Sequence, residues 1–280
     1  MLKTLISFFY CENQKGCLKN TDSKSNLIYF MENGLIDNEH FVFYINVNGE
    51  TTIDFTKYKN KHKNLNILFG DGNIMDAYLS ILNDVTIDDY EFFFFIADKV
   101  RGPYNLDKIN CWIEFFTQKL SSSNTDVLIS SYGTSPWGKL YKFPYITMKF
   151  YCIKRKTLKF LMDYNFFEKT KYNHDDADYY NNPDRHVEIK LSKLLLDNNI
   201  KYVALDKNRI TDLDILKYYK EGNRNKLFEI TKELHRANDS TIINRLFWSG
   251  NVMKKIFEKK DQKFIQKLQE PRDVSKLEKW

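Results

Sequence analysis

The sequence lacks the glycine-rich loops by which many nucleotide-binding enzymes are recognised. It contains neither the phosphate-binding pattern GxxxxGK[ST] nor the dinucleotide-binding pattern GxGxxG, and "GDGN" at 70–73 is too short to be either. These absences argue against a P-loop enzyme and against a dinucleotide-dependent oxidoreductase.

Long apolar runs and cysteine motifs are missing as well. No segment approaches the roughly 18 to 20 apolar residues of a membrane-spanning helix. The N-terminal "MLKTLISFFYCENQ" has a short apolar core and no small-residue cleavage site, so we expect a strand there rather than a signal peptide. The four cysteines form no CxxC and have no histidine at zinc-finger spacing. We therefore expect free thiols in a reducing compartment, with the chain in the cytoplasm, either soluble or peripherally attached to a membrane.

The residues that are present indicate a folded α/β protein. Hydrophobic residues make up 42% of the 280 residues and aromatic residues 16%. Strands alternate with helices, and the strands are almost uninterrupted apolar runs, which predicts a mostly parallel central sheet with helices on both faces. Strands are expected at 4–10, 40–49, 64–72, 90–98, 126–133 and 200–205, helices at 23–36, 73–84, 106–120 and 188–199, and a strand followed by a helix within 145–164. We expect Trp112 to lie in the core.

The charge is unevenly distributed along the chain. Residues 207–280 contain 18 lysines and arginines against 11 aspartates and glutamates, whereas residues 1–206 contain 25 against 26. We expect a domain at 1–206 and a basic segment at 207–280, made only of helices, that packs on it as an appendage. Its basic side chains would form a solvated face, or they would contact an anionic membrane surface or a polyanion.

Small and acidic residues follow several predicted strands, at the edge where open α/β sheets bind ligands. Each position alone is also typical of an ordinary turn. Acids at such an edge suggest a metal that bridges phosphates, because Mg²⁺ or Mn²⁺ needs only one or two protein carboxylates. The residues in question are Glu12, Asn46, Asn48, Gly49, Gly70, Asp71, Gly72, Asn73, Asp76, Asp98, Arg101 and Gly102.

Four segments carry a resemblance to a known family. "FFFFIADKVRGPY" resembles the hydrophobic strand, short acidic motif and "VRGP" of GT-A-type glycosyltransferases found in large DNA viruses, notably chlorella viruses, and in bacterial polysaccharide loci. "NLIYFMENGL" before "FVFYINVNG", "GDGNIMDAYLSIL" and "EIKLSKLLLDNNIKYVAL" are similar to other parts of that family. The resemblance covers roughly residues 3–206. It implies a GT-A, Rossmann-like fold, with the host cytoplasm as the location if the protein is viral.

The resemblance also implies roles for the residues that follow the strands. The donor nucleotide would be bound by Asn46, Asp71, Asn73, Asp76, Asp98, Arg101 and Gly102. The usual metal motif of the family is Asp-x-Asp, whereas here the strand ends Ile96-Ala97-Asp98 and offers one carboxylate. Asp98 would therefore hold Mn²⁺ or Mg²⁺ with ligands from elsewhere, or Lys99 or Arg101 would partly neutralise the diphosphate.

The polar insert "NHDDADYYNNPDRHVE" at 173–188 is the best source of further catalytic groups. Glu188 or Asp176 would act as the base that takes the acceptor proton, although an acid at position 188 is also favoured by a helix N-terminus. His186, like His174, would be a metal ligand or face solvent. The cluster of acids that includes Asp175 and Asp178 would be a solvated loop or a lid over a sugar site, with Asp175 binding the acceptor.

Aromatic residues in "YGTSPWGKLYKFPY" complete the expected acceptor site. Trp137, Tyr141 or Tyr145 would lie against a sugar ring, or the loop would be a hydrophobic plug. The resulting hypothesis is a glycosyltransferase that uses a nucleotide-diphospho-sugar, a UDP-sugar first among them, and a glycan or glycoprotein acceptor. The alternatives are a degenerate sugar-nucleotide-binding protein without catalysis, and a nucleotidyltransferase or nucleic-acid-binding protein, which the near-neutral body makes the weakest.

Overall fold

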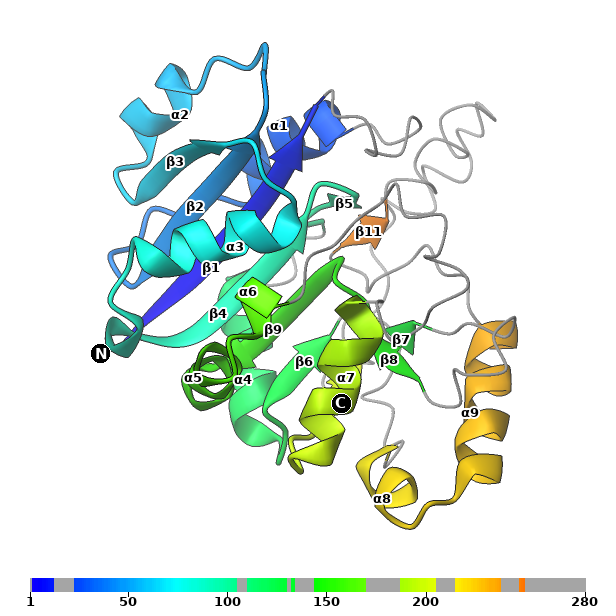
Figure 1. Cartoon of the computed structure of the whole chain (residues 1–280). Coiled ribbons are helices and arrows are strands. Elements are labelled where there is room, and N and C mark those ends of the chain that lie inside the picture. The colour runs from blue at the N-terminus through cyan, green and yellow to red at the C-terminus, as the bar shows by residue number, and fades with distance from the viewer. Residues whose placement is uncertain are drawn as a thin grey trace.

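A seven-stranded sheet lies at the centre of the protein, as the computed structural model shows (Figure 1). The structure describes residues 2–12, 23–104, 110–129, 132–133, 144–169, 187–204, 215–237 and 247–249. The strands are β1 (Lys3–Cys11), β2 (Phe41–Asn48), β3 (Leu65–Gly70), β4 (Tyr90–Ala97), β6 (Val127–Ile129), β9 (Phe150–Lys154) and β10 (Tyr202–Ala204).

The sheet is mostly parallel, as the sequence predicts. Its strand order is β10-β6-β9-β4-β1-β2-β3. Strand β9 is antiparallel to β4 and β6, and every other neighbouring pair is parallel. At one edge of the sheet, six strands therefore end with their carboxyl ends, and β9 begins there with its amino end.

Helices cover both faces of this sheet. They are α1 (Ser23–Asn33), α2 (Thr56–Lys61), α3 (Ile74–Asn83), α4 (Trp112–Ser122), α5 (Arg155–Asp163), α6 (Phe166–Lys169), α7 (Val187–Asp197), α8 (Ile215–Lys220) and α9 (Arg224–Ala237), with a 3-10 turn at Ile87–Asp89. None of the helices within the described residues is long and apolar enough to cross a bilayer.

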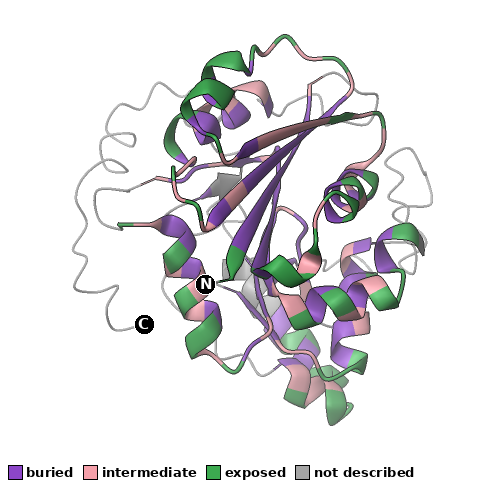
Figure 2. Ribbon diagram, turned by 90° about the vertical axis from the view of Figure 1, so that its left-hand side faces the viewer, coloured by how far each residue is buried: buried purple, intermediate pink, exposed green. Residues whose placement is uncertain are grey.

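Two hydrophobic clusters fill the space between the sheet and the helices. Successive side chains of a strand point to opposite faces, so Phe93 and Phe95 pack on one side and Phe94 and Ile96 on the other. The first cluster includes residues of α3, α5, α6 and α7, and we call its side the α3 face. The second includes residues of α1 and α4, and we call its side the α1 face. Figure 2 shows the buried strands between helices whose outer sides are exposed.

The predicted core position of Trp112 is confirmed. It is fully buried on the α1 face, and its indole Nε1 donates a hydrogen bond to the Gly34 carbonyl at 2.9 Å. Gly34 follows α1 directly, and a Cβ at this position would lie 2.7 Å from the Phe30 ring. Only glycine therefore allows the end of α1 to pack this closely.

The C-terminal segment differs in part from its prediction. Helices α8 and α9 are present, but the expectation of helices alone is wrong at β11 (Trp248–Ser249), which pairs antiparallel with β5 (Val100–Arg101). The preceding Phe247 is fully buried against Trp112 and Phe150, with ring centroids 5.2 and 4.6 Å away. The cause is non-local, because β11 finds its partner about 150 residues earlier in the chain. The domain boundary at 206 stays a prediction.

The strand expected at 126–133 is also divided. Strand β6 ends at Ile129, and Tyr132–Gly133 forms β7, which pairs with β8 (Tyr145–Ile146) outside the central sheet. Residues with strand propensity lie on both sides of the polar pair Ser130 and Ser131, which made the segment look like one strand, although the break falls at this pair.

The expectation of four free thiols is wrong at Cys11. This residue is disulfide-bonded, whereas Cys111 and Cys152 are free. Motif spacing identifies metal-binding cysteines, but a disulfide depends on a Cα separation of about 4.4 to 6.8 Å, which only the folded chain sets. The cysteines therefore no longer support a reducing compartment.

Candidate functional site

The candidate site lies at the carboxyl edge of β1, β2, β3 and β4. Strand register places Cys11 beside Asn48, Asn48 beside Gly70, and Phe9 beside Ala97. The polar residues that end these strands are therefore neighbours in space, as predicted. Ligands of open α/β sheets bind at this edge.

Asp98 follows β4 and is bound to the first turn of α1. Its side chain is buried, with 5% of its surface exposed. Its Oδ2 accepts a hydrogen bond from the Ser23 hydroxyl at 2.8 Å, and its backbone carbonyl accepts one from the Asn26 amide at 2.9 Å. We call Ser23, Asn26 and Asp98 the Asp98 cluster. In this geometry Asp98 positions α1 against the end of the central strand.

The described residues fit a metal ion on Asp98 poorly. Burial raises the pKa of the Asp98 carboxyl above its usual value, although hydrogen bonds from Ser23 and from the backbone of Cys11 and Lys99, and the Lys99 charge, oppose this effect. A divalent cation needs an ionised carboxylate with an accessible oxygen, and Oδ2 is already taken by Ser23. Within the ranges that the structure describes, no three histidine, cysteine, aspartate or glutamate side chains gather as a metal site.

Arg101 lies in β5, and its side chain packs against α1. Its guanidinium donates to the Ser25 hydroxyl at 2.6 Å and stacks over the Tyr29 ring, 4.5 Å from the centroid. Its Nε is buried without a hydrogen-bond partner among the described residues. Gly102 follows with a φ of 152°, a region that side chains other than glycine rarely adopt. The contacts of Arg101 are with α1, with Tyr104 and with β11, so the predicted donor role of Arg101 and Gly102 stays a prediction.

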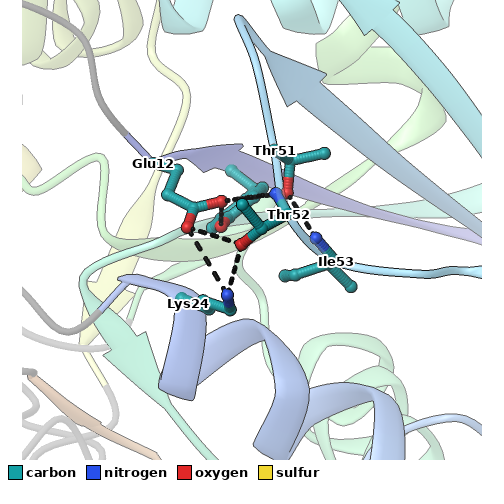
Figure 3. Close-up of polar contacts among 6 residues, drawn as sticks. Glu12, Lys24, Thr51, Thr52 and Ile53 are labelled. Carbon is teal, nitrogen blue, oxygen red and sulfur yellow. Dashed lines mark hydrogen bonds and ion pairs between the residues drawn. The ribbon is translucent and has the colours of Figure 1, made fainter.

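Glu12 directly follows β1 and forms a hydrogen-bonded network that could not be identified from the sequence (Figure 3). Its carboxylate accepts hydrogen bonds from the hydroxyls of Tyr10 at 2.8 Å, Thr51 at 3.0 Å and Thr52 at 3.1 Å, and from the Thr52 backbone N–H at 3.1 Å. The Lys24 ammonium lies 3.6 Å away and also donates to the Thr52 hydroxyl. We call these five residues the Glu12 network; it joins β1, the loop after β2 and α1.

The Glu12 network stabilises the ionised carboxylate. Burial alone would raise the pKa of Glu12, but the hydrogen bonds from Thr52, Tyr10 and Thr51 outweigh it and lower the pKa from 4.5 to about 2. Hydrogen bonds to a charged form commonly have this effect. The signal in the sequence is slight: an acid after an apolar strand, and a Thr-Thr pair after the Asn-Gly turn.

Asn48 has a buried amide whose hydrogen-bonding capacity is unused. It ends β2, only 2% of its surface is exposed, and its Nδ2 has no partner among the described residues. Strand alternation places Asn46 and Asn48 on the α3 face, whereas Glu12 and Asp98 lie on the α1 face. An unpaired buried donor costs about 1 to 3 kcal/mol, so its presence at a ligand-binding edge suggests a ligand acceptor.

The predicted donor residues Asn73 and Asp76 form the N-terminal cap of α3. The Asn73 side chain accepts from the backbone of Met75 and Asp76, and the Asp76 carboxylate accepts from the Asn73 N–H at 3.0 Å. A Cβ at Gly72 would lie 2.4 Å from the Asp76 Cβ, so the "GDGN" turn needs glycine there. Asp71 is exposed on this turn. Nucleoside contacts of all three remain predictions.

Glu188 lies in the first turn of α7, at the amino end of β9. Its Oε1 accepts from the Met148 N–H at 2.9 Å. The next residue, Lys149, is held against β4, because the Ala97 N–H donates to its carbonyl at 2.9 Å. The pKa of Lys149 lies below its usual value. Burial is the main cause and the nearby Lys99 adds to it, whereas the Glu188 carboxylate opposes both. Lys149 could not be chosen from the sequence alone, because the residue before an antiparallel strand reaches this edge only through the topology.

The expected acceptor site is only partly described. Tyr145 lies in β8, opposite Gly133, and its ring occupies the space that a Cβ on Gly133 would need. The remaining candidates lie outside the described residues: Trp137, Tyr141, His174, Asp175, Asp176, Asp178 and His186.

Comparisons with known proteins give similarity at the level of structure. No family model matches the chain, and no curated protein matches it. A nucleotide-diphospho-sugar transferase candidate from Desulfovibrio desulfuricans G20 shares 16% identity with a TM-score of 0.41, over 87% of this chain and 97% of that one. The glycosyltransferase GlyE of Streptococcus pneumoniae TIGR4 shares 9% identity with a TM-score of 0.43, over 82% and 52%. TarS of S. aureus shares 15% with a TM-score of 0.42, over 73% and 36%. The chain thus spans about half of GlyE and a third of TarS.

Proposed function

We propose that the protein is a GT-A-type glycosyltransferase that moves a sugar from a nucleotide-diphospho-sugar to a hydroxyl of a glycan or glycoprotein. The resemblance of residues 3–206 to such enzymes of large DNA viruses and bacterial polysaccharide loci supports this proposal. So does the polar carboxyl edge of a mostly parallel sheet, where nucleotide ligands of α/β proteins bind.

The reaction sets clear demands on the site. The bond between the anomeric carbon of the sugar and the diphosphate breaks, a bond from that carbon to the acceptor oxygen forms, and the acceptor proton passes to a base. The leaving diphosphate carries the electron pair and must be stabilised by positive charge. Glu188 or Asp176 would take the proton in an inverting reaction. No step is assigned to a metal, because the described residues fit one poorly.

The unpartnered amide of Asn48 is the observation that carries the proposal furthest. This buried N–H donor at the edge of the sheet has no acceptor among the described residues, and the carbonyl oxygens of a nucleobase or the oxygens of a ribose would supply one. Asp71, on the neighbouring turn after β3, is exposed to the same edge. We place the nucleoside of the donor there, on the α3 face.

Titration calorimetry with UDP-, GDP- and dTDP-sugars tests the proposal, with UDP-sugars first, in the presence and absence of Mn²⁺. We expect one nucleotide class to bind, and the Asn48→Ala variant to bind it about tenfold or more weakly while keeping the thermal stability of the wild type. Asn66→Ala is the matched control, since Asn66 lies on the next strand but its amide already donates to the Phe43 carbonyl. Absence of binding across the panel would refute the proposal.

A binding protein without catalysis is the second candidate function. The single acid at the end of β4 is engaged by Ser23 and buried, which is what a relative that had lost its metal-dependent chemistry would show. Release of nucleoside diphosphate in the presence of glycan acceptors separates the two functions. Donor binding without release or hydrolysis would favour the second one.

A further inference from the structure

Two lysines stand at the sheet edge where positive charge is needed. Lys99 follows Asp98 directly, and Lys149 precedes β9. The ladder between β4 and β9 pairs Ile96 with Phe150 and continues through the hydrogen bond from the Ala97 N–H to the Lys149 carbonyl. Lys149 is therefore fixed to the end of the central strand by the sheet itself.

The position of Lys149 separates it from Asp98. Tyr151, two residues later, packs on the α3 face, so strand alternation places Lys149 on that face as well. Its electrostatic interaction with Glu188 of α7, which packs on the same face, agrees with this placement. Asp98 instead faces α1, where Ser23 and Asn26 bind it. Lys149 thus shares its face with Asn48, whose Nδ2 has no hydrogen-bond partner within the described ranges.

Each lysine interacts electrostatically with a nearby carboxylate, Lys99 with Asp98 and Lys149 with Glu188, but neither forms a close ion pair among the described residues. No ion pair within 4.0 Å includes Lys99 or Lys149 in that part of the chain, although many surface lysines form one. Glu188 is within electrostatic reach of Lys149, but its Oε1 is directed to the Met148 N–H. Lys99 and Lys149 also repel each other. A half-buried ammonium beside a second cation favours an incoming anion.

We propose that Lys99 and Lys149 bind the diphosphate of the donor and stabilise it as the leaving group, in place of a divalent metal ion. This inference rests on the proposed glycosyl transfer and names the groups that carry its charge. The nucleoside would contact Asn48 on β2, and the diphosphate would extend across the ends of β1 and β4 towards the lysine pair. The bond from the anomeric carbon to the diphosphate breaks with both electrons going to the phosphate oxygen, beside the two ammonium groups.

The test measures the affinity of the nucleoside diphosphate and of the matching monophosphate by calorimetry, on the full chain in EDTA. We expect the wild type to bind the diphosphate more tightly. Lys149→Met should weaken diphosphate binding about tenfold or more and leave monophosphate binding nearly unchanged, because the lysine contacts only the terminal phosphate. Lys149→Arg should keep most of the affinity, and Lys99→Met should show a smaller loss. Lys190→Met, on the exposed side of α7, is the control with no change.

The outcomes distinguish this inference from the proposed function. Diphosphate binding that needs Mn²⁺ and is insensitive to Lys149→Met would overturn the lysine pair while leaving glycosyl transfer in place. Equal weakening of monophosphate and diphosphate binding in Lys149→Met would also overturn it, since that is the result of a distorted fold. Absence of nucleotide binding with and without Mn²⁺ would overturn both proposals.

Discussion

Glu12 and Asp98 directly follow two neighbouring parallel strands, β1 and β4, and both contact the first turn of α1, yet their electrostatic environments are opposite. Glu12 accepts hydrogen bonds from three hydroxyls and a backbone N–H and has a lysine beside it, and its pKa falls to about 2. Asp98 accepts from Ser23 in a buried position, and burial raises its pKa. The balance between burial and hydrogen bonding, and not the place at a strand end, therefore decides the direction in which the pKa of each carboxyl shifts.

This difference separates two roles that a sequence pattern treats as one. The ionised Glu12 ties the loop after β2 to β1 and α1, so it contributes to stability. The Asp98 carboxyl is buried and its Oδ2 accepts from Ser23, so it suits a metal less well than its position suggested. Four experiments test the comparison, from the largest expected effect to the smallest.

Phe247→Ala should weaken the packing of the α1 face next to Asp98 and leave the Glu12 network intact. Phe247 fills the core beside Trp112, Phe116 and Phe150, and the adjoining β11 pairs with β5, just after Asp98. We expect a loss of about 3 to 5 kcal/mol in the free energy of unfolding, measured with urea. Phe69→Ala is the control, because Phe69 is 68% exposed on β3 and should cost much less. Equal losses in the two variants would mean that the segment at 247–249 does not stabilise the α1 face.

Glu12→Gln should destabilise the protein in a pH-dependent way. The folded-state pKa of about 2 lies below the ordinary 4.5, so the contribution is present above pH 4.5 and disappears as the pH falls towards 2. A shift of this size corresponds to about 3 kcal/mol at most. Urea unfolding of wild type and variant at several pH values should show curves that differ at neutral pH and converge in acid. Parallel curves would rule out a stabilising charge on Glu12.

Asp98→Ala and Asp98→Asn should differ from each other. Alanine leaves the Ser23 hydroxyl without its acceptor and should cost about 1 to 3 kcal/mol, whereas asparagine keeps an acceptor oxygen and removes a charge that burial disfavours. The asparagine variant should be close to wild type at neutral pH and should still bind the donor nucleotide. Loss of nucleotide binding in a folded Asp98→Asn protein would return Asp98 to the binding site.

Arg101→Lys should have the smallest effect. Lysine keeps the charge but loses the planar stacking on Tyr29 and the directed bond to Ser25. We expect a loss of about 0.5 to 1 kcal/mol in the free energy of unfolding and little change in nucleotide affinity. A large drop in affinity with unchanged stability would instead support the predicted donor role of Arg101.

The fold was predictable from the sequence to a large extent, because buried strands such as Phe92–Ile96 are continuous apolar runs and α3 has its apolar residues at helical spacing. The polar strand ends were also predictable. The Glu12 network was not, since its members at 10–12, 24 and 51–52 meet only in three dimensions. Lys149 was missed because the sequence does not show that β9 is antiparallel to its neighbours. The same non-local pairing hid β11.

The burial of Phe247 has a consequence for how the chain is made. Synthesis begins at the N-terminus, so every strand of the central sheet leaves the ribosome before Phe247 does. Until it arrives, the nascent chain leaves a gap between Trp112, Phe116 and Phe150, and these aromatic rings lack their last neighbour. A nascent chain whose Phe247 is still inside the ribosome should therefore present a form that chaperones bind, and their release should follow once Phe247 has left the ribosome.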